Sequence, residues 1–221
     1  MVVVIDGKRW EMNRTKYIEE TEHAVKQLFE GIVYYSRMLE EMPNPVFVSD
    51  TPFKDKESWE REFNKWQEEH RQEIEKSLEK SREYLGLSFS KATLGGSILQ
   101  IASMGIELCS SNTQIPSCCT SFVKPKQKAI KHCIGREVRG LPIGIIIYAA
   151  RNQYNHWDDP KPHHITQTVF EFLACNHDYG RVRDSAFDLS NPNVRIYSHN
   201  ILNLLGWKSY EKYEKDIRAI I

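Results

Sequence analysis

The 221-residue sequence has no long apolar run and no excess of charge of either sign. The apolar residues from Val2 to Ile5 stop at Asp6-Gly7-Lys8, too early for a signal-peptide core, and we expect no membrane-spanning stretch elsewhere. Lys and Arg total 30, as do Asp and Glu, which argues against a protein that coats nucleic acid non-specifically. We therefore expect a cytoplasmic protein without a membrane segment.

Cysteines are few, and their spacing is irregular. There are five of them, an odd number, so we expect reduced thiols and no disulfide framework. The pairs Cys118-Cys119 and His132-Cys133 lack the spacing of a zinc ribbon or finger. The glycines at 135, 140 and 144 lack the GK[ST] ending of a phosphate loop. The sequence therefore predicts neither a metal nor a cofactor.

What the chain does contain is enough apolar material for a core, with 40% hydrophobic and 27% charged residues. We expect one domain over residues 1–221, with a core from about 15 to 175 and a C-terminal extension from about 176 to 221. Tryptophans and tyrosines such as Trp59, Trp66, Trp207 and Tyr213 fall at helical spacing, which favours core packing over exposed base-stacking platforms.

Apolar residues recur three or four apart over most of the chain, as in amphipathic helices. The first helix is expected from Thr15 to Met42, and the next from about Trp59 to Leu85, closed by Gly86. The pattern as a whole predicts an all-α antiparallel bundle of five to six helices with a small N-terminal hairpin at Asp6-Gly7 and a C-terminal helical extension. The other expected elements are helices at 91–108, 127–134, 141–157, 166–174, 200–205 and 210–220, and a short strand at 194–197.

Charge is unevenly distributed along the neutral chain. Acidic residues predominate between Tyr17 and Leu85, whereas basic residues predominate between Ser121 and His164. A local basic surface attracts anions even in a neutral protein, although an ordinary solvated face explains the same pattern.

The helix expected at 141–157 is apolar all round in its first half. Ile143, Ile146 and Ile147 share one face, whereas Ile145 and Ala149, with Tyr148, lie on the other. Two apolar faces need two covers, so we expect a homodimer formed through the outer face, around a two-fold axis.

The second half of that outer face is polar. Tyr148, Asn152 and Asn155 lie near its midline, with Arg151 and His156 to either side. Long side chains in these positions can converge on one small anion.

This run, Ala150-Arg151-Asn152-Gln153-Tyr154-Asn155-His156, resembles the arginine, polar residue, spacer, histidine motif of the HEPN superfamily. The resemblance covers about Thr15 to Cys175, and the motif's helix context is the same. Many members of that superfamily are metal-independent RNA endonucleases that act as dimers, and several are toxins or antiviral effectors. The resemblance therefore implies RNA as the partner and Arg151 and His156 as the catalytic pair, with Asn152 as their positioning residue.

One departure from the family concerns Asp158. Some HEPN toxins have at this position a tyrosine that a partner enzyme modifies, so we infer no such partner, and the sequence names no antitoxin or regulator. On the residues alone, Tyr148 and Asn155 are further candidates for substrate binding. Arg136 and Arg139 precede the motif helix and are candidates for contacts with RNA phosphates.

The chemistry of these residue types suits RNA cleavage. Histidine exchanges protons near neutral pH, and arginine presents a charged fork of donors to phosphate oxygens. Two other interpretations remain open. Arg151 and His156 could merely offset the helix dipole at a C-terminus, or a catalytically inactive module could use them to bind a nucleotide or a protein.

Overall fold

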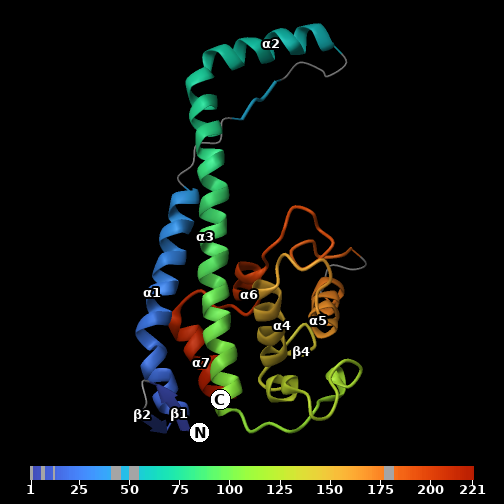
Figure 1. Ribbon diagram of the computed structural model, residues 1–221. Coiled ribbons are helices and arrows are strands. Elements are labelled where there is room, and N and C mark those ends of the chain that lie inside the picture. Colours follow the sequence, from blue (N-terminus) through green and yellow to red (C-terminus); the bar gives the residue numbers. More distant parts are fainter. Residues whose placement is uncertain (1, 6–7, 12, 41–45, 50–54, 177–181) are drawn as a thin grey trace. The chain divides into compact units, whose positions relative to one another are not determined.

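The structure is a computed structural model of residues 1–221, and it describes all of them except 1, 6–7, 12, 41–45, 50–54 and 177–181 (Figure 1). Helices dominate, accompanied by two small antiparallel strand pairs, so the predicted all-α class with an N-terminal hairpin is confirmed. The elements are β1 (Val2–Ile5), β2 (Lys8–Glu11), α1 (Arg14–Glu40), α2 (Lys56–Glu69), α3 (Arg71–Cys109), the 3-10 turns η1 (Ser117–Cys119) and η2 (Lys128–His132), β3 (Glu137–Val138), β4 (Leu141–Pro142), α4 (Ile143–Asn155), α5 (His164–Cys175), α6 (Ser198–Leu204) and α7 (Tyr210–Ile220).

The chain divides into two compact units. The first comprises residues 1–32 and 91–221, and the second comprises residues 33–90. The long helices α1 and α3 each contribute residues to both units. The prediction of a single domain over the whole chain did not anticipate this division.

The hydrophobic core of the first unit draws on α1, the second half of α3, and α4 to α7. Trp207, Tyr210 and Tyr213 are at most 6% exposed, which confirms the prediction that they are core residues. The segment expected to be a C-terminal extension is therefore part of the core itself. Its buried apolar side chains include Tyr197, Ile201, Leu202, Leu205, Trp207, Tyr213, Ile217 and Ile220.

The second unit contains a stack of aromatic rings. Trp59, Phe63, Trp66 and His70 stack successively along α2, and Phe47 packs edge-on against this row. None of the α2 residues is buried, so the prediction that Trp59 and Trp66 belong to a core is wrong. The rings cover one another in part, but the rest of this short helix is polar or charged, and no other side chain of α2 is buried over them.

Two hairpins are present, of which the sequence predicted the first. Strands β1 and β2 pair antiparallel, although the predicted turn at Asp6-Gly7 lies outside the described residues. The second hairpin joins β3 to β4 through Arg139 and Gly140, whose φ angles are 51° and 78°. Two consecutive positive φ angles are typical of a two-residue hairpin turn, so Leu141-Pro142 forms a strand and not the expected first turn of a helix.

Two other local predictions were wrong. Gly86 does not end a helix, because α2 stops at His70 and α3 then continues through Gly86 to Cys109. Residues 194–197 form no strand, because the side chain of Gln153 takes the hydrogen bonds a partner strand would have taken. Its Nε2 donates to the Arg195 carbonyl at 2.7 Å, and its Oε1 accepts from the Tyr197 amide at 3.2 Å.

One described segment, Gly86–Cys109, is long and apolar enough to cross a membrane, with half of its apolar window buried in the chain. The expectation that nothing reaches membrane length was therefore too strong. A core helix has the same length and composition, and Ile98, Leu99, Ala102 and Ile106 of this segment are completely buried.

The glycines of α3 give a stability prediction. A Cβ at Gly96 would lie 2.4 Å from the Tyr154 ring, whereas a Cβ at Gly86 would have nothing within 4 Å. We expect Gly96→Ala to lower the free energy of unfolding by about 1–3 kcal/mol through overpacking. Gly86→Ala, the matched control in the same helix, should raise it by up to about 1 kcal/mol through helix propensity. Urea unfolding of both variants measures the difference, and equal effects would contradict the close Gly96–Tyr154 contact.

Candidate functional site

Helix α4 begins directly after the second hairpin and lies deep in the first unit. The Ile143 amide donates to the Arg136 carbonyl at 2.9 Å, and the Gly144 amide donates to the Ile134 carbonyl at 3.1 Å. Gly144 faces the His132 carbonyl so closely that a side chain there would collide with backbone. The start of α4 is therefore held by η2 and the residues that follow it.

The apolar residues of α4 are covered by their own chain. Ile143, Ile145, Ile146, Ile147 and Ala149 are all 0% exposed, with α5, α6 and η2 packed around the helix. The physical reason given for a homodimer, that the outer face needs a second copy to cover it, was therefore wrong. A charge at Ile145 would disrupt the core of one chain, so that substitution cannot report on assembly.

A cavity of about 350 Å³ opens at the C-terminal end of α4. Three of the residues predicted for the site, Tyr148, Asn152 and His156, are among its lining residues. The remainder come from α4 itself, from the connection between α4 and α5, and from the first turn of α5. Its lining also includes Gln153, Asp159, Lys161, Pro162, His163 and Thr166.

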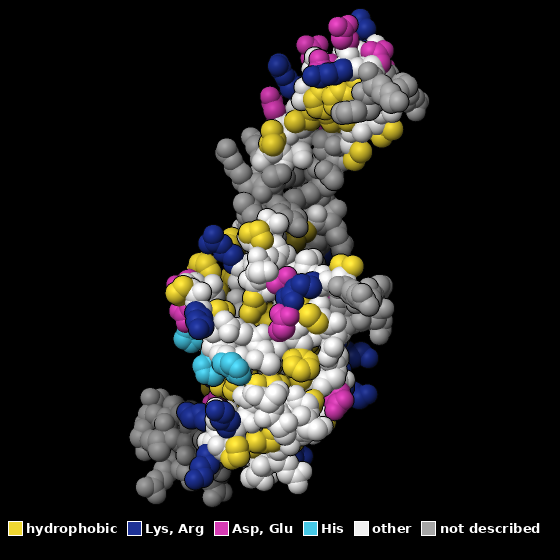
Figure 2. All heavy atoms as spheres, turned by 90° about the vertical axis from the view of Figure 1, so that its right-hand side faces the viewer, with side chains coloured by type: hydrophobic (Ala, Val, Ile, Leu, Met, Phe, Trp, Pro, Cys, Tyr) yellow, Lys and Arg dark blue, Asp and Glu magenta, His cyan; other side chains and the backbone are white. Residues whose placement is uncertain are grey.

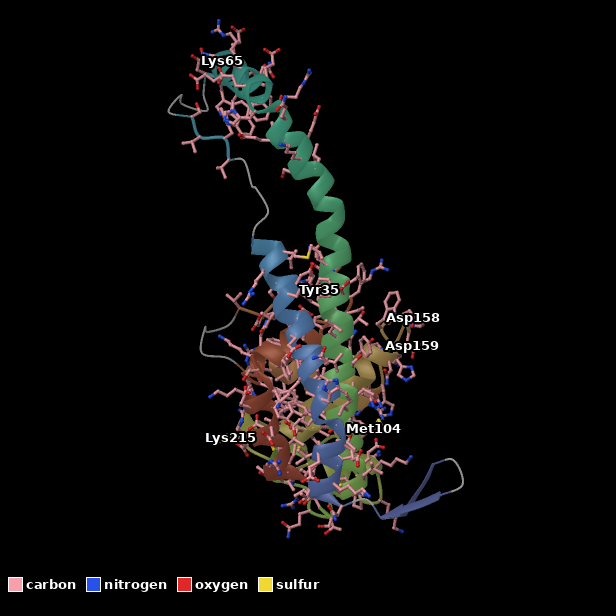
Figure 3. All side chains as sticks on the ribbon, turned by 90° about the vertical axis from the view of Figure 1, so that its left-hand side faces the viewer. Tyr35, Lys65, Met104, Asp158, Asp159 and Lys215 are labelled. Atoms are coloured by element: carbon pink, nitrogen blue, oxygen red, sulfur yellow. The ribbon has the colours of Figure 1, made fainter. Side chains whose placement is uncertain are left out.

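His156 caps α4 and is oriented by an acidic neighbour. Its Nδ1 lies 3.1 Å from Oδ2 of Asp159, and the imidazole is 61% exposed. Figure 3 labels Asp159 beside Asp158 in the turn that follows α4. With Nδ1 facing a carboxylate, the proton of a neutral His156 lies on Nδ1, and Nε2 is left as the atom that exchanges protons.

Arg151 is not among the residues that line the cavity. Its Nη2 pairs with Oε1 of Glu107 on α3 at 3.3 Å, and its Nη1 donates to Oδ1 of Asn152 at 3.0 Å. Since the amide oxygen of Asn152 accepts from Arg151, its Nδ2 is left to donate elsewhere. Asn152, the predicted positioning residue, thus lines the cavity. Arg151, the predicted catalytic residue, does not line it and instead contacts Asn152 and Glu107.

The opposite wall of the cavity is formed around the N-terminus of α5. Nδ1 of His163 accepts from the Ile165 amide at 3.4 Å, so the proton of a neutral His163 lies on Nε2. Lys161 is exposed, and the free amides at a helix N-terminus add partial positive charge. The cavity therefore contains two imidazoles, the ammonium group of Lys161 and the carboxylate of Asp159, which is paired with His156.

The other predicted site residues lie elsewhere. Asn155 donates to Gln100 of α3 at 3.2 Å and does not line the cavity. Arg136 pairs with Asp216 at 2.8 Å and donates to the Leu205 carbonyl. Arg139 pairs with Asp184 at 2.7 Å and donates to the Leu173 carbonyl. Both arginines therefore join distant segments of the chain, and we leave them out of the site.

Sequence reasoning placed none of Asp159, Lys161 and His163 in the site, although it counted Lys161 in the basic segment and considered proton transfer by His163-His164. These three residues follow the motif in a segment that contains Pro160 and Pro162, and only the turn between α4 and α5 brings them back to it. The signal in the sequence was the high density of ionisable side chains between His156 and His164. Among the residues that the structure describes, no group of three or more His, Cys, Asp or Glu could hold a metal ion.

Comparison with known proteins gives no family. No protein-family model, no curated protein and no solved structure matches this chain.

A buried histidine packs against Tyr148, one of the residues that line the cavity. The ring of His132 lies 4.9 Å from the ring of Tyr148, and its Nε2 lies 3.2 Å from the Ser103 hydroxyl. His132 is 0% exposed, and burial lowers its pKa from 6.5 to about 4. Folding therefore requires this imidazole to be neutral.

That requirement predicts how stability depends on pH. Because the folded-state pKa is below the ordinary value, the unfolded chain takes up the proton first as the pH falls. We expect about 3 kcal/mol of the free energy of unfolding to be lost between about pH 6.5 and about pH 4 through His132. Denaturant unfolding should show a smaller acid loss in His132→Gln than in the unchanged protein. His163→Gln, which removes an exposed imidazole, is the control, and an equal acid loss in all three proteins would refute this assignment.

Proposed function

We propose that the protein is a metal-independent endoribonuclease that cleaves RNA in the cavity at the end of α4. The observation that carries this proposal is the composition of the cavity. Asn152 and His156 of the motif meet Lys161 and His163 there, within a single chain. Cleavage of RNA by its own 2′-hydroxyl needs a base, an acid and donors for phosphate oxygens, and these four side chains supply all three.

The resemblance of the α4 sequence to the HEPN motif supports the same proposal. That motif too places its polar residue and histidine in one site on a late helix of a helical domain. The dimer associated with the motif stays a prediction, now without the burial argument that led to it. A role as a toxin or defence effector likewise stays a prediction.

The reaction is an in-line displacement at phosphorus. Nε2 of His156 takes the proton of the 2′-hydroxyl, the 2′-oxygen forms a bond to phosphorus, and the bond to the 5′-oxygen breaks. Protonation of His163 at Nδ1, which ends its hydrogen bond from the Ile165 amide, makes its Nε2–H the acid that gives a proton to the leaving 5′-oxygen. Lys161 and the amides at the start of α5 stabilise the negative charge that develops on the phosphoryl oxygens. The products are a 2′,3′-cyclic phosphate and a 5′-hydroxyl.

Arg151 and Asn152 exchange the roles that the motif alone suggested. Nδ2 of Asn152 faces the phosphoryl oxygens, while Arg151 fixes the amide in that orientation through the 3.0 Å bond to Oδ1. Glu107 in turn holds Arg151. In this proposal Arg151 is a positioning residue and Asn152 contacts the substrate.

The direct test is cleavage of labelled single-stranded RNA by the purified chain in excess chelator. We expect products that end in 2′,3′-cyclic phosphate and 5′-hydroxyl, identified by mass. His156→Ala should reduce the rate by about 10²–10⁴-fold, the usual contribution of one acid–base group.

Asn155→Ala is the matched control, since Asn155 lies one residue away on the same helix but outside the cavity. Its rate should stay within a few-fold of the unchanged protein, and both variants should keep the thermal unfolding transition. A strict magnesium requirement, 5′-phosphate ends or efficient cutting of DNA would overturn the mechanism. A catalytically inactive module that binds a ligand at the same residues would then be the better account.

The roles of Arg151 and Asn152 are tested by a double-mutant cycle on the cleavage rate. If Arg151 acts through Asn152, then Asn152→Ala should slow the unchanged protein but have little further effect on Arg151→Ala. Arg151→Lys keeps the charge but not the fork of donors, and it should rescue little. Additive losses in the double variant would instead show that Arg151 acts on the substrate by itself.

A further inference from the structure

A second and larger cavity lies at the C-terminal end of α3. It is lined in part by Glu107, which pairs with Arg151 of the motif. Its volume is about 600 Å³, which is within the usual range for sites that bind a nucleotide-sized molecule. Glu107 at the end of α3 forms one side, and the loop that leads to η2 forms the other. The lining residues are Glu107, Asn112, Thr113, Ile115, Pro125, Lys126, Gln127, Lys128, Ile130 and Lys131.

The rim of this cavity is positively charged. Lys126 and Lys128 are exposed, and neither has an ion pair with any residue that the structure describes. Lys131 donates from Nζ to the Glu107 carbonyl at 2.7 Å, and the Glu107 carboxylate is paired with Arg151. The single acid of the cavity is thus already neutralised, and the lysines leave a net positive charge.

The loop holds these lysines in a fixed conformation. The Lys124 amide donates to Oε1 of Gln127 at 2.8 Å, and the Gln127 amide donates back to the Lys124 carbonyl at 3.2 Å. Lys126, between them, has a φ of 73°, a left-handed conformation that is uncommon outside glycine. The cavity also has an apolar side, formed by Ile115, Pro125 and Ile130. An apolar side and a cationic rim together suit a base and its phosphate.

A series of contacts joins this cavity to the one at the end of α4. Glu107 lines the first cavity and pairs with Arg151, Arg151 donates to Asn152, and Asn152 lines the second. Figure 2 shows histidine side chains and, below them, a group of Lys and Arg side chains on one face of the molecule. In this series of contacts the Arg151–Glu107 pair connects the two cavities.

We infer that this cavity, the lysine cavity, binds a nucleotide of the RNA strand outside the two that flank the cut, with its phosphate against Lys126 and Lys128. This inference rests on the proposed function, because it takes single-stranded RNA as the ligand. It adds a subsite that lies outside the motif and extends the substrate beyond a dinucleotide.

The test measures binding without cleavage. The probe is a fluorescent, fully 2′-O-methylated single-stranded RNA of about ten nucleotides, which has no 2′-hydroxyl to react. Its affinity for the full chain is measured by anisotropy over a range of salt concentrations. Each lysine–phosphate contact contributes about 0.7 to the slope of log K against log salt for a single strand, so Lys126→Gln with Lys128→Gln should reduce the slope by about 1.4.

Lys212→Gln with Lys215→Gln is the matched control. It removes the same number of charges from exposed positions on α7, and Figure 3 shows Lys215 on the other side of the first unit from Asp158 and Asp159. The control should leave the slope unchanged, and the cavity variant should cleave a dinucleotide at the unchanged rate while cleaving long RNA more slowly at low RNA concentration.

The outcomes separate this inference from the proposed function. Equal slopes for the two double variants, or no binding of the probe by the unchanged protein, would overturn the lysine subsite even if RNA is cut. Lysine-dependent binding without any cleavage would instead uphold the subsite and refute the nuclease.

Discussion

The structure depends on the burial of one helix, α4, by segments of its own chain. Residues from Ile143 to Ile147, followed by Ala149, leave no apolar surface exposed on its first turns. Tyr148 and, except for Gln153, the residues from Arg151 to Asn155 reach solvent, so the polar side chains of the motif lie toward the C-terminal end of the helix. Because the helix is fixed by backbone contacts at its start and by packing along its length, those side chains project from a rigid element.

The same helix also fixes the C-terminal part of the chain. Gln153 is 5% exposed, and its amide bonds the backbone at Arg195 and Tyr197 as an edge strand would. Buried amide groups are costly unless every donor and acceptor is satisfied, so this pairing has few alternatives. It places Tyr197 and α6 against α4, which explains why a segment that looked like an appendage belongs to the core.

Helical periodicity predicted most helices of the first unit, since burial of one face is a local property of the sequence. It failed at Gly86, where the low helix propensity of glycine was taken as an end, although a long helix tolerates a cost of about 1 kcal/mol. Periodicity also showed that the first half of α4 is apolar on all sides, but it could not show which segments cover those sides. The covering atoms come from η2, α5 and α6, whose positions only the tertiary fold determines.

Asn152 and His156 of the motif line one cavity, but the motif could not give the direction of each side chain. Arg151 turns toward α3 because Glu107 offers a carboxylate there, and a pairing over that sequence distance is invisible in the α4 segment alone. Lys161 and His163 were not assigned to the site for a related reason. They belong to the connection into α5, and the turn after α4 determines which wall of the cavity they form.

The Arg151–Glu107 pair acquires a second purpose when the two proposals are taken together. It orients Asn152 for the reaction, and it also neutralises the single carboxylate of the lysine cavity. Without the guanidinium, Glu107 would face Lys131 and the strand's phosphates as an unpaired negative charge. Under both proposals, loss of Arg151 would weaken binding in the lysine cavity as well as cleavage, whereas loss of Asn152 would act only at the site of cleavage. Arg151 therefore links binding of the RNA strand to its cleavage under both proposals.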